Sequence, residues 1–381
     1  MNLERALARN DSDYSESLLS INPIKKRSSP LTLLTAGREK ISNSSVFFES
    51  LLIAIPESRK KLKKLICSQT HLGETRDGKQ IYLYQNTKVC PVISEIGRLR
   101  EIAFRAVGEG TGQRRDIDQY DATYSQLILW DAHDKEIVGA YRLADAGLII
   151  QNESIEGLYS ALLFKYEAAI LPILKQGAEL GRSFVQPKYW GKRSLDYLWY
   201  GIGSFLSQNP HVRYLFGPVS LSNDMPKAAK DLMVYFFTLY FGQPKHQRKF
   251  LKNSGCFDQN SKQTLKSIEK FAHSKQPYRL SSDLIESLKT NFSGDDYKED
   301  FKTLKHILSN MGCSVPTLFK QYSELCEPGG LVFLDFGVDA GFGECIDGLV
   351  MVDISKIKQK KRDRYIPENK NLKSYSVSKE G

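Results

Sequence analysis

The sequence has few of the features that mark metal-binding, disulfide-stapled or membrane-spanning proteins. Its six cysteines are scattered over 381 residues with no C-x-x-C pair, which argues against a zinc ribbon, a thioredoxin-like site and a disulfide scaffold. The six histidines form no metal-ligand spacing, so we expect no bound metal. No apolar run could span a bilayer, and no apolar stretch near the first methionine indicates a signal peptide. We therefore expect a cytoplasmic protein with reduced thiols.

The short motifs of hydrolases and nucleotide-binding enzymes are also missing. No G-x-S-x-G elbow is present, which removes the usual sign of a serine hydrolase. Residues 108–112 contain three glycines but follow a predicted helix rather than a strand, so they are interpreted as a plain loop. Residues 191–194 resemble the end of a P-loop, but Gln186 stands where its first glycine is needed.

The charge is strongly unbalanced toward positive. Lys and Arg number 54 against 44 Asp and Glu, which gives a net charge of +10. Such an excess suits a nucleic acid, an anionic membrane surface or an acidic protein partner, without choosing among them. A basic nucleic-acid-binding protein is one alternative function, but no helix-turn-helix, RRM or KH signature supports it, and we expect no nucleic-acid partner.

Hydrophobic periodicity predicts an α/β protein, in which helices and strands are interspersed along the chain. We expect helices over 47–66, 93–107 and 196–206, and strands over 80–84, 126–130, 137–143, 178–185, 214–219, 331–338 and 349–354. The predicted organisation is a flexible arm with an accessory helix over 1–78, an α/β core over 79–225, a mostly helical insertion over 226–327, strands that complete the core over 328–365 and a tail over 366–381. The apolar stretch 233–241 is interpreted as a core helix, with the lining of a site for an apolar ligand as the alternative.

The most informative segment runs from residue 179 to residue 222. A strand carrying Glu179 and Arg182 ends before Pro187, and a loop with Gly191 leads into a helix that begins at about Ser194. Backbone N–H groups at the start of a helix form a site for phosphate or pyrophosphate. This layout predicts that the loop holds a phosphate-bearing arm of a substrate.

Several motifs in this order resemble one family. They are Leu99-Arg100 with Phe104, Asp118-x-x-Asp121, Val138-Gly139-x-Tyr141-Arg142-Leu143, Glu179-Leu180-Gly181-Arg182-Ser183-x-Val185-x-Pro187, Leu198-Trp199-x-Gly201-Ile202, Tyr214-Leu215-Phe216-Gly217-x-Val219-Ser220, Leu334-Asp335-Phe336-x-Val338-Asp339-x-x-Phe342-Gly343 and Asp347-Gly348-Leu349. Together they resemble the ornithine–acyl carrier protein N-acyltransferases, also known under the name hemolysin, which are related to acyl-homoserine-lactone synthases. The resemblance implies their GNAT-like α/β fold with a mixed sheet.

The resemblance implies an enzyme that acylates an amino acid. It would move a long-chain fatty acyl group, with or without a 3-hydroxyl, from acyl carrier protein to the α-amine of an amino acid such as ornithine or glycine, the first step of aminolipid synthesis. No cofactor would be bound permanently, because the phosphopantetheine belongs to the donor. Residues 188–194 depart from the usual pyrophosphate-loop pattern, which favours acyl carrier protein over CoA as the donor. The positive charge would suit that acidic carrier and peripheral contact with the anionic inner face of the membrane. An acyl-homoserine-lactone-type synthase using S-adenosylmethionine is the alternative.

The resemblance also suggests which residues form the site. Glu179 is expected to take the proton of the amine, with a structural ion pair to Arg142 or Arg182 as the alternative. Arg100, Arg142 and Arg182 would form a charge network with Asp118 and Asp121, and one arginine would hold the acceptor carboxylate. Arg142 and Arg182 are assigned to catalysis with Glu179. The remaining predicted substrate contacts are Phe104, Ser183, Phe184, Val185, Lys188, Gly191, Lys192, Arg193 and Ser220, with backbone N–H groups near Phe184 and Val185 as oxyanion donors.

Overall fold

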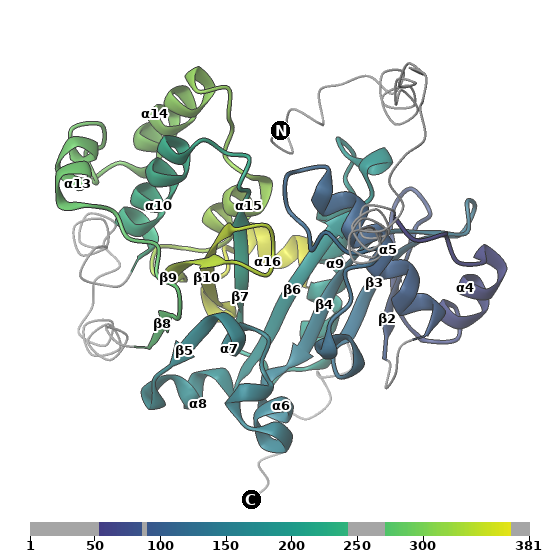
Figure 1. Ribbon diagram of the computed structural model, residues 1–381. Helices are drawn as coiled ribbons and strands as arrows, with labels where there is room; N and C mark the ends of the chain where they lie inside the picture. The colour runs from purple at the N-terminus through teal and green to yellow at the C-terminus, as the bar shows by residue number, and fades with distance from the viewer. Residues whose placement is uncertain (1–52, 86–89, 243–270, 367–381) are drawn as a thin grey trace, which may run out of the picture.

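The computed structural model describes residues 53–85, 90–242 and 271–366 (Figure 1). The predicted N-terminal arm, most of the tail and the middle of the predicted insertion lie outside these ranges. The domain boundaries expected from the sequence therefore stay a prediction.

A single mixed sheet forms the centre of the protein (Figure 1). Its strands are β1 (Thr70–Glu74), β2 (Gln80–Tyr84), β3 (Ser125–Asp131), β4 (Glu136–Asp145), β6 (Gly177–Val185), β7 (Tyr214–Leu221), β9 (Leu331–Asp339) and β10 (Cys345–Asp353). Their order is β1-β2-β3-β4-β6-β7-β10-β9, and every neighbouring pair is antiparallel except β6 and β7. The strands predicted from the sequence are confirmed, including the β3–β4 hairpin; of the two C-terminal strands, β10 pairs with β7 and β9 pairs with β10.

Helices cover both faces of the sheet because its strands alternate apolar side chains between the two faces. In β2, Ile81 and Leu83 pack in the cluster that contains α9 (Ser194–Gln208), whereas Tyr82 and Tyr84 pack in the cluster that contains α5 (Pro91–Arg105). Both helices were predicted. The first predicted helix is shorter than expected, because α4 (Arg59–Ile66) begins after Pro56. Residues 47–52 lie outside the described part.

The predicted insertion is mostly helical where it is described. It contains α10 (Lys227–Phe241), α13 (Ser282–Lys289), α14 (Tyr297–Asn310) and α15 (Thr317–Leu325), with the short strand β8 (Ala272–Ser274). α10 is a core helix, as its apolar sequence indicates, because Phe236, Phe237 and Tyr240 are fully buried. β8 pairs with β5 (Phe164–Tyr166) in a second, two-stranded sheet.

The structure contains several short elements that were not predicted from the sequence. They are β1, β5 and β8, the helices α6 (Ala146–Glu153), α7 (Ser160–Leu163) and α8 (Leu171–Leu174) between β4 and β6, and α16 (Gln359–Tyr365) after β10. Segments this short carry little periodicity, so tertiary contacts decide their conformation.

The sheet opens between β6 and β7. These strands pair only from Gly177–Tyr214 to Glu179–Phe216 and then separate. Gly217, at φ +154°, lies where they part, and a Cβ there would be 1.9 Å from the carbonyl oxygen of Leu180. Only glycine allows this close approach of the two backbones. The separation leaves a gap in the sheet that side chains from several elements surround.

A bulge on β6 shapes one side of that gap. The register with β4 shifts between Ala140–Phe184 and Arg142–Gly181, and Arg182 has a left-handed backbone with φ +49°. The bulge adds one residue and reverses the alternation of the strand. As a result Leu180 packs on the α9 side of the sheet and Phe184 on the α5 side.

Candidate functional site

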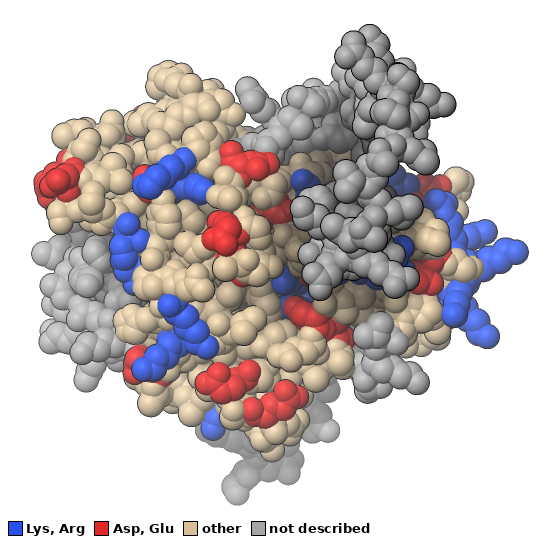
Figure 2. All heavy atoms as spheres, viewed as in Figure 1, with Lys and Arg blue, Asp and Glu red and all other residues tan. Residues whose placement is uncertain are grey.

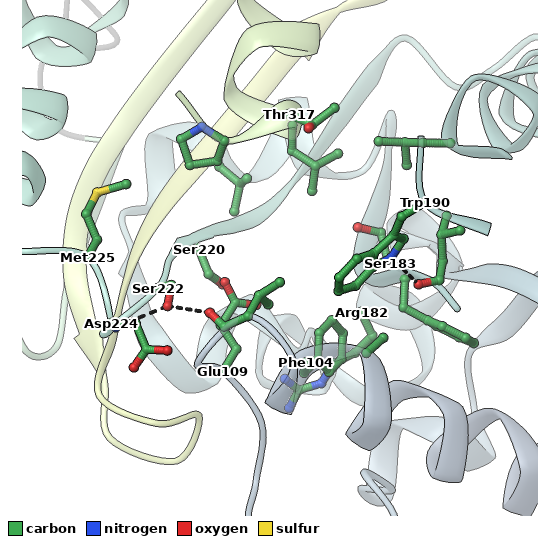
Figure 3. A pocket seen from close by; sticks show the side chains of 18 of the residues that line it. Phe104, Glu109, Arg182, Ser183, Trp190, Ser220, Ser222, Asp224, Met225 and Thr317 are labelled. Atoms are coloured by element: carbon green, nitrogen blue, oxygen red, sulfur yellow. Dashed lines mark hydrogen bonds between the residues drawn. The ribbon is translucent and has the colours of Figure 1, made fainter. Parts of the chain in front are cut away.

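A cavity of about 560 Å³ occupies the gap between β6 and β7 (Figure 3). Its walls come from β6, β7, the end of α5, the loop before α9, the turn after β7, the α14–α15 connection and the β9–β10 hairpin. Figure 3 shows Glu109, Ser220 and Asp224 at one side and Ser183 and Trp190 at the other. The cavity therefore connects the predicted phosphate-binding loop with a group of charged side chains.

The loop between β6 and α9 forms one end of the cavity. Trp190 donates its indole N–H to the carbonyl oxygen of Val185 at 2.8 Å, which ties the loop to β6. Gly191 has φ +73°, and Arg193, the residue before α9, accepts no side-chain hydrogen bond from the first backbone N–H groups of the helix. The first backbone N–H groups of a helix lack partners within that helix, so this end suits a phosphate group.

The basic residues of this loop do not all face the cavity. Gly191 and Lys192 line it, whereas the Lys188 ammonium pairs with Glu136, and Arg193 pairs with Asp196 at 3.1 Å. Lys188 and Arg193 keep about half of their side-chain surface exposed, at 48 % and 50 %. They lie outside the cavity wall, so any contact with a donor would be at the protein surface.

The predicted charge network exists and lies beneath the cavity. Arg100 donates to both carboxylate oxygens of Asp121, at 2.8 and 3.0 Å, and Arg142 donates to Asp118. Burial alone would raise the pKa of Asp121, but Arg100 and Arg142 lower it below its ordinary value. Asp118 and Asp121 also form a capping box at the start of the turn at residues 119–122, so the network holds the loop between α5 and β3.

Arg182 connects this network with the cavity. Its guanidinium lies 3.8 Å from Asp118 and 3.6 Å from Asp116, and it stacks at 4.3 Å on the ring of Phe342. Burial alone would lower the pKa of Arg182, but Tyr159 and the nearby carboxylates raise it by more, so its pKa lies above the ordinary value and the group stays charged. The side chain is 10 % exposed and lines the cavity. A fixed cation is thus presented to whatever binds there.

Glu179 is enclosed below the cavity rather than in its wall. It is 1 % exposed, and its carboxylate accepts hydrogen bonds from the Tyr124 hydroxyl and from the N–H groups of Tyr159 at 3.0 Å and Ser160 at 2.7 Å. Burial raises its pKa, and these hydrogen bonds oppose that increase. The alternative role, a structural ion pair with Arg142 or Arg182, is not among the described ion pairs. The carboxylate holds the start of α7, and its role as base stays a prediction.

The predicted site residues thus fall into three groups. Those that line the cavity are Phe104, Arg182, Ser183, Phe184, Val185, Gly191, Lys192 and Ser220. Those that support it from beneath are Arg100, Asp118, Asp121, Arg142 and Glu179. Lys188 and Arg193 lie outside it. The assignments of these residues to particular roles stay predictions.

Sequence reasoning missed the acidic side chains of the cavity, Glu109, Asp224 and Asp347. Glu109 stands between Gly108 and Gly110 in the segment interpreted as a plain loop, and Asp347 stands inside an apolar strand. A carboxylate in the middle of a buried strand is costly without a partner, and that was the available signal. These residues come from distant parts of the chain, so no single motif contains them.

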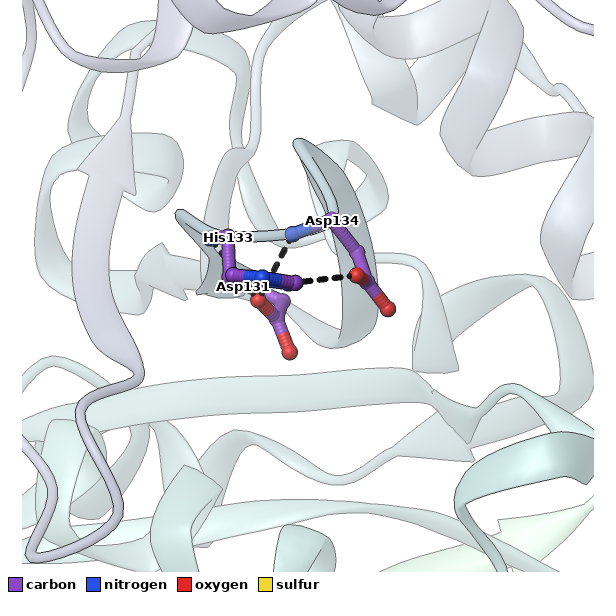
Figure 4. Close-up of side chains that lie close together, drawn as sticks. All are labelled: Asp131, His133 and Asp134. Atoms are coloured by element: carbon purple, nitrogen blue, oxygen red, sulfur yellow. Dashed lines mark hydrogen bonds and ion pairs between the residues drawn. The ribbon is translucent and has the colours of Figure 1, made fainter.

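Figure 4 shows a group of a different kind, at the turn between β3 and β4. Asp131 accepts hydrogen bonds from the N–H groups of His133 and Asp134, both at 3.0 Å, and the His133 ring lies 2.8 Å from the Asp134 carboxylate. Within the described ranges this is the one group of three or more His, Cys, Asp or Glu side chains that lie close enough together to hold a metal ion. Its contacts hold a hairpin turn, and it does not line the cavity.

Over the described ranges, no helix is both long and apolar enough to cross a membrane.

Comparisons with known proteins give matches to the part of the chain that contains this site. The acetyltransferase (GNAT) domain family matches residues 99–200, which include the charge network, the bulged strand and the loop before α9. A glycine N(alpha)-acyltransferase of Bacteroides thetaiotaomicron is 31 % identical over 324 residues, covering 82 % of this chain and 88 % of that protein. Its counterpart in Phocaeicola vulgatus is 30 % identical over 329 residues, covering 82 % of this chain and 92 % of that protein.

More distant relatives share the central part of the chain. An L-ornithine N(alpha)-acyltransferase of Brucella abortus is 30 % identical over 149 residues, covering 34 % of this chain and 50 % of that protein. No solved structure matches. Of the activities considered from the sequence, these matches support amino-acid N-acylation. The fold, the cavity between parting strands and the relatives agree, and the chain belongs to the family of GNAT-fold amino-acid N-acyltransferases.

Proposed function

We propose that the enzyme transfers a long-chain fatty acyl group, with or without a 3-hydroxyl, from acyl carrier protein to the α-amine of glycine, as the first step of aminolipid synthesis. The choice of glycine over ornithine rests on coverage. The relatives named for glycine align with 82 % of the chain, whereas the Brucella abortus relative named for ornithine aligns with 34 %.

The observation that carries the proposal is the placement of Arg182 at the charged end of the cavity. Of the three arginines expected to hold the acceptor, Arg182 is the one whose side chain lines the cavity, whereas Arg100 and Arg142 are engaged beneath it. A guanidinium fixed by stacking can bind both oxygens of a carboxylate. The amino acid would then lie with its carboxylate on Arg182 and its amine toward the cavity, where the thioester arrives from the loop before α9.

The donor end fits a carrier-bound phosphopantetheine. An apolar middle section that includes Val185, Pro218 and Val219 suits the thin pantetheine arm, and Gly191 with the start of α9 suits its phosphate. Lys188, Lys192 and Arg193 gather around the same loop, where an acidic carrier protein would dock. CoA is the alternative donor, and no permanently bound cofactor is part of the proposal.

We place the enzyme in the cytoplasm, in peripheral contact with an anionic membrane. Figure 2 shows Lys and Arg gathered over α4. The exposed residues of this helix are Arg59, Lys60, Lys61, Lys63 and Lys64, while Leu62 and Ile66 anchor it to the protein. A basic face of this kind is attracted to anionic lipid. A product with a long acyl chain would be released next to the bilayer that receives it.

Acyl transfer by the purified enzyme tests the proposal. Long-chain acyl carrier protein and the matching acyl-CoA are compared as donors, and glycine and ornithine as acceptors, with the N-acyl product measured by mass spectrometry. We expect glycine with acyl carrier protein to give the highest kcat/KM, and added salt to weaken the preference for the carrier, because exposed charges are screened within about 8 Å at physiological ionic strength.

Lys192→Glu is the matched variant for docking, and Lys175→Glu, at an exposed lysine after α8 that does not line the cavity, is its control. The first is expected to raise the KM for acyl carrier protein, and the second to leave it unchanged. Equal use of both donors at every salt concentration would contradict the carrier assignment, and preference for ornithine would contradict the acceptor.

A further inference from the structure

The charged end of the cavity contains more negative than positive charge. Glu109, Asp224 and Asp347 reach it from three separate elements, and Arg182 is the one cationic side chain that lines it there among the described residues. Asp347 is 3 % exposed, and its Oδ1 atom has no hydrogen-bond partner within the described structure. A buried carboxylate oxygen without a partner is costly, so it indicates a position completed by a ligand that donates hydrogen bonds.

Glu109 lies in a tight turn, and its carboxylate is not engaged by the described contacts. The loop around it turns through Gly108 at φ +74° and Gly110 at φ +109°, and the N–H of Glu109 donates to Phe104 at 2.9 Å. Its side chain is partly exposed at the cavity, and no described hydrogen bond or ion pair engages its carboxylate. The glycines therefore allow the turn that places Glu109 at the cavity, with its carboxylate available to a substrate.

Charged side chains from several elements act on the carboxylate of Glu109. The pKa of Glu109 is raised to about 8, because burial and the charges of Asp347 and Asp224 outweigh the opposing effect of Arg182. Burial and Asp339 raise the pKa of Asp347 to about 7. The Cys345 thiol, whose pKa burial raises, also faces Glu109. An ammonium ion would be attracted by these carboxylates, and a base is most efficient when its pKa lies near the working pH.

We propose that Glu109 is the general base that accepts the proton of the acceptor ammonium group, and that Asp347 binds the same group through its unpartnered Oδ1. The proposal rests on amino-acid N-acylation itself and not on the choice of glycine or of the donor. In this arrangement the amine contacts Glu109 and Asp347, which line the cavity, whereas Glu179 is enclosed beneath the cavity.

The proton balance follows from the reaction. The ammonium group gives one proton to Glu109, and the neutral amine nitrogen attacks the thioester carbonyl carbon. The C–S bond then breaks, the second proton of the nitrogen passes to the leaving thiolate, and an amide and a free thiol remain. Glu109 returns its proton to solvent through the cavity. No oxidant, reductant or metal is needed.

Three substitutions test these roles by steady-state kinetics with the best amino acid and donor of the wild type. Glu109→Gln is expected to lower kcat/KM for the amino acid roughly 100- to 10,000-fold. Asp347→Asn is expected mainly to raise the KM for the amino acid and to move the acidic limb of the rate profile to lower pH, because it removes a negative charge near Glu109. Glu167→Gln, at a half-buried glutamate outside the cavity, is the matched control and is expected to behave as wild type.

Hydroxylamine separates a lost base from a distorted site, because this amine is already neutral at pH 7. With hydroxylamine in place of the amino acid, Glu109→Gln is expected to retain a rate within about threefold of wild type, and Glu109→Asp should restore part of the amino-acid activity. A Glu109→Gln enzyme that acylates the amino acid within threefold of wild type would overturn the proposal. So would an equal loss with both amines.

Discussion

Replacing Glu179 by glutamine distinguishes a carboxylate that holds the fold from one that takes the amine proton. In the structure its two oxygens accept from the Tyr124 hydroxyl and from the N–H groups of Tyr159 and Ser160. Glutamine keeps one accepting oxygen and brings an amide NH2 group, so at least one of these buried donors would face another donor. One unsatisfied buried group costs about 1–3 kcal/mol, and we expect the free energy of unfolding to fall by that amount.

The folded Glu179→Gln variant should keep much of its activity. Glu179 contacts the backbone of Tyr159, whose ring lies 5.2 Å from the Arg182 guanidinium, so the carboxylate acts on the site through its neighbours. We expect a loss of about tenfold in kcat, far less than the 100- to 10,000-fold typical of a missing general base. Urea denaturation followed by circular dichroism, together with kinetics on the same preparation, measures both effects.

The opposite result would refute this reasoning. If Glu179→Gln unfolds at the same urea concentration as wild type and loses activity by more than 100-fold, Glu179 is the base, as the family resemblance implies. The acidic limb of the rate profile would then disappear in this variant and persist in Glu109→Gln. The two carboxylates are thus separable by the same pair of assays.

Three further predictions concern the framework of the site. Arg142→Lys keeps the charge but cannot reproduce the planar contact with Asp118, so we expect about 2 kcal/mol lower stability in urea and reduced activity; unchanged values would show that the network is dispensable. Gly217→Ala places a Cβ 1.9 Å from a β6 carbonyl oxygen and should lower the melting temperature and the activity, whereas Gly181→Ala, where a Cβ meets nothing within 4 Å, should leave the cavity intact; similar melting curves would contradict this. Because the pKa of Glu109 is about 8 in the folded protein against 4.5 ordinarily, the unfolded chain releases this proton first, and the free energy of unfolding falls as pH rises between those values; Glu109→Gln should therefore be more stable than wild type in urea at about pH 8, and a less stable variant would exclude the assigned shift.

Local patterns in the sequence were sufficient for most of the framework. Neighbouring residues determine the alternation in β2 and β3, the end of a strand before Pro187 and the start of a helix at Ser194. The strand, loop and helix at the donor end could therefore be predicted. The charge network of Arg100, Asp118, Asp121 and Arg142 was expected because these motifs resemble those of a known family. These features could be predicted because each depends on residues that are close in the sequence or on a motif shared with relatives.

Tertiary structure decided which carboxylates reach the substrate. Alternation along β6 could not place Arg182 and Phe184, because the bulge at Arg182 adds a residue and reverses the faces. The pairing of β10 with β7 brings Asp347 opposite Ser220, and the fold places Glu109 at the same cavity, although the two acids lie in distant segments. Strand order is fixed by the burial of whole faces rather than by any local preference, and so the sequence alone predicted a site without its acidic wall.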